Sequence, residues 1–226
     1  MSLRAAALIP AFREEREIAR VVRAAREQVD LVLVVDDGSD DRTADRAREA
    51  GAEVIAHPAN RGKGAAIKTG LRALDARGVE WVVLLDGDGQ HDPGEIGRFL
   101  AAIGQGDRVL AVGNRMRDLS AMPWIRRVTN RVMSATISRL CGQPIPDSQC
   151  GFRMLPRAAI PVVDCPTDRF DYETEMLIVA SRAGFRVVPV PVSTIYAGEK
   201  SKIHPVRDTL NFIRLVRRYS GRSARP

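Results

Sequence analysis

The chain of 226 residues contains few cysteines and few aromatic residues. The cysteines number three and show no C-x-x-C spacing, which argues against a disulfide framework or a zinc site. Aromatic residues make up 5%, and no apolar run approaches the ~20 residues that a membrane-spanning helix needs. The apolar start, Ala5 to Ile9, is too short for a secretory signal, so we expect an unprocessed cytoplasmic protein.

The length and composition fit one soluble globular domain. Hydrophobic residues make up 45% and charged residues 28%, which excludes the disordered and collagen-like classes. We expect a main domain over residues 1–203, followed by a basic amphipathic helix and tail over 204–226.

The formal net charge of +7 is unevenly distributed along the chain. Residues 1–113 hold 16 basic and 19 acidic side chains, a net charge of −3, whereas residues 114–226 hold 19 and 9, a net charge of +10. Such a basic half indicates an anionic partner: nucleic acid, phosphate or a membrane surface.

Apolar runs alternate with amphipathic helical patterns in the first half, which predicts a parallel sheet built from βαβ units. The second half is less regular, and its last strand contains Pro189 and Pro191, which favour a sheet edge. The expected strands span residues 5–9, 31–35, 53–56, 81–85, 109–112, 151–155 and 185–192. The expected helices span residues 14–29, 43–50, 65–76, 92–103, 122–140, 172–182 and 204–219.

Two of the buried strands end in aspartate clusters, at Asp36-Asp37 and at Asp86-Gly87-Asp88. Ligands of open α/β sheets bind beyond the carboxyl ends of the strands, so both clusters should face one crevice. Carboxylates spaced by a small glycine suit Mg²⁺ or Mn²⁺ shared with substrate phosphates. The alternative is two tight turns capped by their own side chains.

Two common phosphate-binding loops are absent. No G-x-G-x-x-G follows the first strand, and Gly62-Lys63-Gly64 lacks the spacing of a Walker A loop. That glycine segment is as compatible with a flexible turn as with a binding loop.

The chain resembles the family 2 inverting glycosyltransferases and, more narrowly, the polyprenyl-phosphate sugar transferases similar to dolichyl-phosphate mannose synthase. The resemblance runs from about Leu8 to His204. It rests on seven segments in order, namely 8–15, 35–43, 60–64, 86–93, 113–115, 147–153 and 201–202. It implies a GT-A fold, a Rossmann-like and mostly parallel sheet with helices on both faces. It also implies a nucleotide-sugar donor linked to GDP or UDP.

The resemblance also assigns roles to residues of the donor site. Pro10, Phe12 and Glu14 would line the nucleotide pocket, and Phe12 stands where tyrosine is common. Asp37 would hydrogen-bond the base. Asp86, with Gly87 beside it, would contact the donor. Asp88 and Gln90 would hold Mg²⁺ or Mn²⁺ bridging the diphosphate.

On the acceptor side, the resemblance implies that Arg115 and Arg126 receive the phosphate of a polyprenyl phosphate. Lys202 would lie on a segment that closes over the donor. Gly198-Glu199-Lys200-Ser201-Lys202 has one residue more than the commoner Gly-x-Ser-Lys, so either Lys200 or Lys202 would meet the diphosphate.

The chemistry of a phosphate acceptor agrees with the residues present. A phosphate monoester has a second pKa near ~6, so it is a dianionic nucleophile at neutral pH and needs no strong base. His57, His91 and His204 form no triad, and we expect them to be noncatalytic. If the acceptor were instead a sugar hydroxyl, Asp171 or Glu173 would supply the base.

The C-terminal segment, residues 204–219, combines apolar and arginine-bearing sides. It either lies on an anionic membrane or docks its apolar stripe on the domain. A nucleic-acid-binding module is a weaker alternative, because the basic residues are not interleaved with aromatics and the acidic clusters would repel a phosphate backbone. A nucleotidyltransferase is disfavoured by the missing glycine-rich loop. We therefore expect an enzyme that binds no nucleic acid, at most peripheral on the inner face of the membrane.

Overall fold

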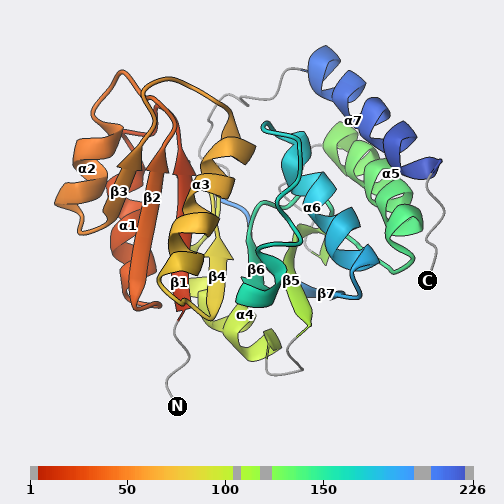
Figure 1. Cartoon of the computed structure of the whole chain (residues 1–226), viewed down its shortest axis with the longest axis horizontal. Helices are drawn as coiled ribbons and strands as arrows, with labels where there is room; N and C mark the ends of the chain where they lie inside the picture. The colour runs from red at the N-terminus through yellow and green to blue at the C-terminus, as the bar shows by residue number, and fades with distance from the viewer. Residues whose placement is uncertain (1–4, 104–107, 118–123, 196–204, 222–226) are drawn as a thin grey trace.

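The computed structural model describes residues 5–103, 108–117, 124–195 and 205–221, which form one mixed sheet flanked by helices (Figure 1). The strand order is β3-β2-β1-β4-β6-β5-β7. The strands are β1 Ala5–Ala11, β2 Leu31–Asp36, β3 Glu53–Ala56, β4 Trp81–Leu84, β5 Val109–Asn114, β6 Arg153–Pro156 and β7 Arg186–Pro191. The helices are α1 Ile18–Arg26, α2 Thr43–Glu49, α3 Lys63–Ala76, α4 Ile96–Ile103, α5 Trp124–Cys141, α6 Asp171–Arg182 and α7 Pro205–Ser220. Single 3₁₀ turns span Pro93–Glu95, Arg115–Arg117 and Arg157–Ala159.

The centre of the sheet is β1, whose seven residues are all buried. It pairs in parallel with β2 on one side and β4 on the other. Unbroken aliphatic runs are what a strand covered on both faces requires. The carboxyl ends of β1, β2 and β4 consequently lie at one edge of the sheet, as the βαβ pattern predicts.

The strand β6 lies antiparallel between β4 and β5, a direction that the sequence analysis did not anticipate. Its register pairs Val83 with Met154 on one side and Ala111 with Met154 on the other. This insertion carries the preceding loop, residues 147–152, to the carboxyl ends of β4 and β5. The segment therefore joins the crevice from the second half of the chain.

Helices cover both faces of the sheet, and α3 crosses in front of its centre (Figure 1). A side chain at Gly70 in α3 would collide with Leu8 of β1, so glycine permits this close approach. The edge strand β7 carries Pro189 and Pro191, as predicted. Asp92 caps the turn that begins at Pro93 by accepting a hydrogen bond from the Gly94 N–H at 2.9 Å.

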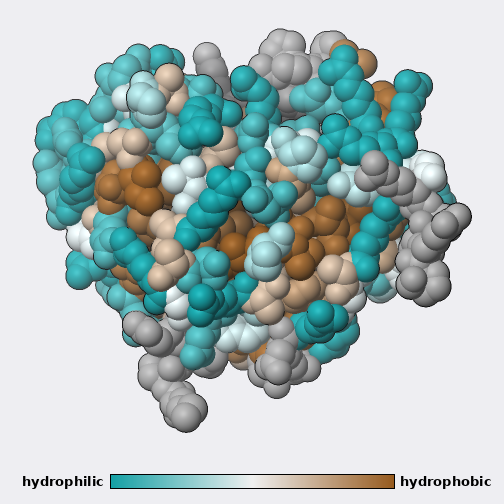
Figure 2. Space-filling view, in the orientation of Figure 1, coloured by the Kyte–Doolittle hydropathy of each residue, from teal (hydrophilic) through white to brown (hydrophobic). Residues whose placement is uncertain are grey.

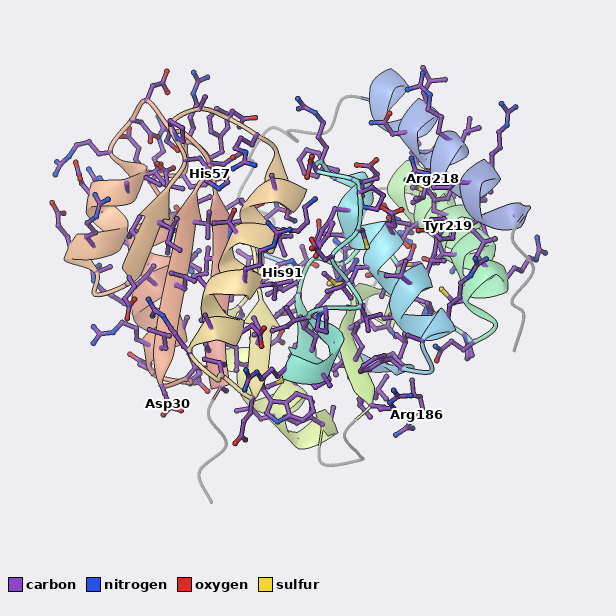
Figure 3. The ribbon with its side chains drawn as sticks, in the orientation of Figure 1. Asp30, His57, His91, Arg186, Arg218 and Tyr219 are labelled. Carbon is purple, nitrogen blue, oxygen red and sulfur yellow. The ribbon has the colours of Figure 1, made fainter. Side chains whose placement is uncertain are left out.

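The helix α7 docks on the domain through one side, and its anchor is the fully buried Glu175 of α6. The Glu175 carboxylate accepts hydrogen bonds from the Tyr219 hydroxyl at 2.8 Å and from Arg218 Nη1 at 3.1 Å. Both side chains point from α7 toward α6 (Figure 3). Leu215 and Tyr219 are buried, whereas Arg218, Leu210 and Ile213 are exposed. Among the described residues no helix is long and apolar enough to span a bilayer.

Candidate active site

The first wall of the crevice is the loop after β1, which is tied to the loop after β2. The N–H of Arg13 donates to Ser39 Oγ at 2.9 Å, and the N–H of Glu14 donates to Thr43 Oγ1 at 2.8 Å. Arg13 has a φ of 54°, a left-handed conformation that a non-glycine residue seldom adopts. Phe12 is half-buried, with the Arg13 guanidinium 5.1 Å from its ring centroid. The structure thus brings together Phe12, Glu14 and the β2 end.

Asp37 organises the loop that leads into α3. It is almost fully buried, and its carboxylate accepts hydrogen bonds from the N–H groups of Arg61 at 2.9 Å and Gly62 at 2.7 Å. His57 Nδ1 lies 2.8 Å from the same carboxylate, and its Nε2 lies 3.0 Å from Thr69 Oγ1 (Figure 3). These contacts fix the start of α3. Asp37 therefore stabilises this loop, in addition to its predicted hydrogen bond with the nucleotide base.

The centre of the crevice is an ion-pair cluster of three side chains, Asp86, Lys63 and Glu173. Lys63 Nζ lies 2.6 Å from Asp86 Oδ1 and 2.7 Å from Glu173 Oε2. Burial penalises the Asp86 charge, but the Lys63 ammonium outweighs that penalty and holds the pKa of Asp86 below its usual value. Burial likewise opposes the Lys63 charge, and the two carboxylates outweigh it and raise the pKa of Lys63. The contact between Lys63 and Asp86 therefore joins two ionised groups.

Lys63 has no predicted role, because it lies in a glycine segment that also fits an ordinary turn. The feature of the sequence that could have indicated a role is a lysine between two glycines at the start of a helix. The structure shows why the glycines matter. A side chain at Gly64 would meet Tyr172 Cβ at 2.6 Å, so α3 begins in close contact with α6.

His91 adjoins this cluster as a neutral imidazole. Its Nε2 is 3.8 Å from Asp86 Oδ2, and its ring packs 5.3 Å from the ring of Phe152. Burial lowers the pKa of His91 to about 4. The imidazole is therefore uncharged at neutral pH, and its noncatalytic role stays a prediction.

Asp88 and Gln90 follow β4 and are both half-buried. Asp88 Oδ1 accepts a hydrogen bond from the N–H of Gln90 at 3.0 Å, which fixes the turn between them. Their carboxylate and amide oxygens are hard donors that fit Mg²⁺ or Mn²⁺ if water and phosphate complete the coordination. Among the described residues no three His, Cys, Asp or Glu side chains gather as a metal site. The residues present therefore fit a cation shared with a substrate rather than an all-protein cage.

Arg115 follows β5 and is held by Asp147, whose side chain is fully buried. Arg115 Nε lies 2.7 Å from Asp147 Oδ2 and its Nη2 lies 2.9 Å from Oδ1, a bidentate pair. Asn130 of α5 donates to the same carboxylate at 2.8 Å. The Arg115 charge helps to lower the pKa values of both Asp86 and His91, so it lies near both side chains.

Several other residues were predicted for the donor and acceptor sites. Arg126 lies in the first turn of α5, and its side chain falls outside the described residues, as do Lys200 and Lys202. Pro10 lies in β1, opposite Val35.

Arg153 is a buried residue that the sequence analysis placed only within a motif. Its guanidinium donates to the backbone carbonyls of Ser148 at 3.0 Å, Cys150 at 2.8 Å, and Glu173. The guanidinium therefore joins the 147–152 loop to α6. No property of the sequence alone distinguishes such a structural arginine from a phosphate-binding one.

Replacing Asp147 by alanine should destabilise the protein by about 3–5 kcal/mol, because it leaves the Arg115 charge and Asn130 without their buried partner. Chemical denaturation checks this, with the exposed Asp164→Ala as the matched control. Burial opposes the Asp147 charge, but Arg115 and Asn130 outweigh it and lower the pKa of Asp147. The folded-state pKa lies below the unfolded value near ~3.9, so this stabilisation is present above that pH and is lost as pH falls through the folded pKa. An unfolding free energy equal to that of wild type would contradict the assignment.

Comparison with known families identifies the chain. The family model described as glycosyl transferase family 2 matches residues 6–163. The chain belongs to this family. It is a glycosyltransferase, and the match covers the donor-side residues from Pro10 to Gln90 but neither Glu173 nor Lys202.

Two relatives of this chain are also named as glycosyltransferases. It is 32% identical over 212 residues to a UDP-N-acetylglucosamine–dolichyl-phosphate N-acetylglucosaminyltransferase of Methanococcus voltae, with 84% of each chain covered. It is 32% identical over 219 residues to glycosyltransferase AglJ of Haloferax volcanii, with 93% of this chain and 70% of the relative covered.

Solved structures confirm the GT-A fold. Glucosyl-3-phosphoglycerate synthase of Mycobacterium tuberculosis bound to UDP matches with a TM-score of 0.72 at 21% identity, covering 97% of this chain and 80% of that one. The same enzyme with Mn²⁺, UDP and phosphoglyceric acid matches with a TM-score of 0.68 at 20% identity, covering 94% and 75%. At this identity the similarity concerns the fold.

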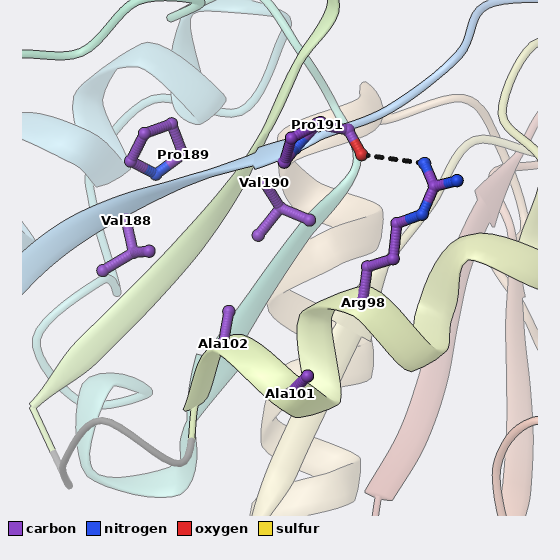
Figure 4. Close-up of a pocket in the computed structure, with 7 residues that line it drawn as sticks. All are labelled: Arg98, Ala101, Ala102, Val188, Pro189, Val190 and Pro191. Atoms are coloured by element: carbon purple, nitrogen blue, oxygen red, sulfur yellow. Dashed lines mark hydrogen bonds between the residues drawn. The ribbon is translucent and has the colours of Figure 1, made fainter.

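A shallow groove of about 380 Å³ lies elsewhere, between α4 and the edge strand β7. Ala101, Ala102 and Val188 to Pro191 line it, and Arg98 at one end donates to the Pro191 carbonyl at 3.1 Å (Figure 4). None of the predicted site residues contributes to this lining.

Proposed function

We propose that this glycosyltransferase moves a hexose from a GDP- or UDP-linked donor to a polyprenyl phosphate, with a divalent cation and with inversion at the anomeric carbon. The observation that carries the proposal is Arg115. Its guanidinium is fixed by a bidentate pair with the buried Asp147, and its charge lies near enough to Asp86 to help lower the pKa of that carboxyl. A fixed guanidinium is suited to a phosphate. The dolichyl-phosphate transferase among the relatives supports a lipid-linked phosphate.

In the proposed reaction an oxygen of the acceptor phosphate attacks the anomeric carbon opposite the nucleoside diphosphate. The bond between that carbon and the diphosphate oxygen breaks, and its electron pair leaves with the diphosphate. A divalent cation held at this site would supply neutralisation of the charge that develops on the diphosphate. Asp88 and Gln90 would hold that cation, and Arg115 orients the nucleophile. The donor lies between the β1–β2 loops and Asp86.

A second acceptor class, a sugar hydroxyl, requires a base. Asp171 has a raised pKa, chiefly because of burial, and so favours this alternative more than Glu173, which is paired with Lys63. Replacing Asp171 and Glu173 in turn by the matching amide distinguishes the two mechanisms. Loss of transfer with Asp171→Asn, in a variant that folds and binds donor, would support the hydroxyl acceptor. A phosphate acceptor predicts that transfer persists.

The outer face of α5 suggests how a lipid acceptor is reached. Trp124, Ile125, Val128 and Val132 are exposed on the side opposite the buried Asn130 and Ser134, and Trp124 is 71% exposed. Leu210 and Ile213 are exposed on the neighbouring α7. Figure 2 shows apolar atoms among hydrophilic ones along the edge where these helices lie.

The charges on these two helices match an anionic surface. Each helix contains four arginines, α5 contains no acidic residue, and α7 contains one aspartate. Apolar burial and attraction between arginine and headgroups act together at a lipid surface. We propose that α5 and α7 rest on an anionic membrane. The hypothesis of a membrane-bound C-terminal helix thus extends to α5, although α7 also docks on the domain.

Vesicle binding tests this surface. Trp124 emission should shift to shorter wavelength with phosphatidylglycerol-containing vesicles, because the ring enters an apolar environment, whereas the buried Trp81 reports little. Replacing Val128 and Val132 by serine should weaken binding about tenfold or more, since each valine buries apolar surface worth about 1.5 kcal/mol. Arg23→Glu on α1 is the control for charge. If the variants of Val128 and Val132 bound vesicles as tightly as wild type, the proposal would be refuted. Retention on RNA instead of vesicles would favour the nucleic-acid alternative.

A further inference from the structure

Glu175 is a fully buried carboxyl group that the proposed reaction does not use, and its two oxygens bond to two different segments of the chain. Oε1 accepts hydrogen bonds from the Tyr219 hydroxyl and from Arg218, both on α7. Oε2 accepts from Thr167 Oγ1 at 2.6 Å, in the loop that precedes α6. Burying a carboxyl group costs free energy, and an apolar side chain of similar volume often packs as stably. The presence of Glu175 therefore indicates a role beyond packing.

That loop, residues 164–170, packs against the first turns of α3. The carbonyl oxygen of Asp168 accepts a hydrogen bond from the N–H of Ala65 at 3.0 Å. Lys68 Nζ lies 2.5 Å from Asp168 Oδ1. A Cβ atom built at Gly64 would lie 2.8 Å from the Asp168 carbonyl carbon, so the loop and the helix are in close contact. The position of the loop therefore sets the position of the start of α3.

The start of α3 belongs to the crevice. The first residue of the helix is Lys63, whose ammonium nitrogen lies 2.6 Å from Asp86 Oδ1. A shift of the first turn would move this ammonium away from the Asp86 carboxylate. Successive contacts therefore lead from α7, through the Glu175 carboxyl group and the 164–170 loop, to the donor side of the crevice.

The end of α7 is held on α6 at Tyr219. Arg182, about two helical turns after Glu175 on α6, donates from Nη2 to the Tyr219 carbonyl at 2.8 Å, and its guanidinium lies 5.0 Å from the ring centroid. Burial and the hydrogen bond with Glu175 raise the pKa of Tyr219, so the phenol keeps its proton and remains a donor. The docked position of α7 therefore includes polar contacts that a single substitution removes.

We propose that Glu175 is a positioning residue through which the docking of α7 completes the donor side of the crevice. When α7 is docked, Glu175 orders the 164–170 loop, and the loop holds the first turn of α3 with Lys63 beside Asp86. The inference rests on the proposed function in that it takes Asp86 to contact the donor. Because coupling between two sites is reciprocal, bound donor in turn stabilises the docked helix.

Amide hydrogen exchange of the unliganded protein tests this link without any substrate. Tyr219→Phe keeps the ring but removes the hydrogen bond to Glu175. Glu175→Gln keeps the shape of the side chain but places an NH₂ group opposite one of its donors. In both variants the Ala65 N–H should exchange about threefold or more faster than in wild type, because the loop that holds its acceptor is less fixed.

Donor affinity, measured without acceptor or vesicles, tests the consequence for the crevice. The probes are UDP- and GDP-linked hexoses with Mn²⁺, and the one that binds the wild type is used throughout. Its dissociation constant should rise about threefold to tenfold in Tyr219→Phe and in Glu175→Gln, the range expected for one buried hydrogen bond. In wild type, the bound donor should also slow amide exchange in α7, and this protection should be weaker in both variants.

Two control variants separate positioning from a general loss of stability. Ser220→Ala also removes a hydroxyl from the end of α7, but that hydroxyl bonds within the helix, to the Val216 carbonyl at 2.8 Å. Ile103→Val opens a small core cavity in α4, which packs on β5 and β7. Both controls should keep the wild-type exchange rate at Ala65 and the wild-type donor affinity.

Wild-type exchange at Ala65 in the folded Tyr219→Phe and Glu175→Gln variants would overturn the inference. Unchanged donor affinity in both, or an equal loss of affinity in Ile103→Val, would overturn it as well. If one of the two variants does not fold, the other decides. If no UDP- or GDP-linked hexose binds the wild type, the proposed donor is wrong, and the exchange rate at Ala65 still decides whether α7 positions the start of α3.

Discussion

Replacing Asp88 by alanine is expected to reduce turnover by about a thousandfold or more while leaving the fold intact. Asp88 supplies one of two protein oxygens for the proposed cation, and loss of that cation removes several kcal/mol of stabilisation from the departing diphosphate. The side chain is half-buried after β4, and it accepts a local hydrogen bond from the N–H of Gln90. The measurement is nucleotide release with saturating donor, acceptor and Mn²⁺.

The matched control is Asp40→Ala, an exposed aspartate at the end of β2 whose partner is Arg13. It should retain most of its activity, because it lies on the rim and contributes no oxygen to the proposed cation site. Full activity of purified Asp88→Ala with metal present would refute the metal assignment. A melting temperature well below that of wild type would instead attribute the loss to folding.

Replacing Arg115 by alanine should lower kcat/KM for the acceptor by about a hundredfold, since a charge-assisted hydrogen bond is worth about 1.5–3 kcal/mol. Donor affinity should change far less, because the proposed contact with the donor is Asp86 and not Arg115. The variant also leaves the buried Asp147 unpaired, so its stability must be measured in parallel.

Arg115→Lys separates the two effects. It keeps the positive charge beside Asp147 but loses the bidentate geometry, so we expect a folded enzyme with a raised KM for the acceptor. Arg23→Ala serves as the control for surface arginines. If the folded Arg115→Ala variant had the wild-type KM for the acceptor, the proposed phosphate contact would be wrong.

Much of the fold was predictable because local patterns and the global fold agree. The aliphatic run before Asp36 and the run before Asp86 became the buried strands β2 and β4, and β1 lies between them as the βαβ pattern requires. The family resemblance, confirmed by the family match, supplied the GT-A fold.

The missed features depend on contacts between segments distant in sequence. The direction of β6 is set by its neighbours β4 and β5, not by its four residues. Lys63 acquires its position from Glu173, more than a hundred residues later, and no spacing rule links them. No pattern in the acidic start of α6 indicates that Glu175 is fully buried, where its carboxylate accepts hydrogen bonds from Thr167 and from Tyr219 of the C-terminal helix.

The most direct test of the central claim is transfer itself. The purified enzyme, with Mn²⁺ and a panel of GDP- and UDP-linked hexoses, is incubated with a polyprenyl phosphate, and the product is analysed for mass and anomeric configuration. We predict a polyprenyl-phosphate hexose whose anomeric configuration is opposite to that of the donor, formed only when the lipid carries its phosphate. Retention of configuration, or transfer to a sugar hydroxyl with no product on the lipid phosphate, would contradict the account.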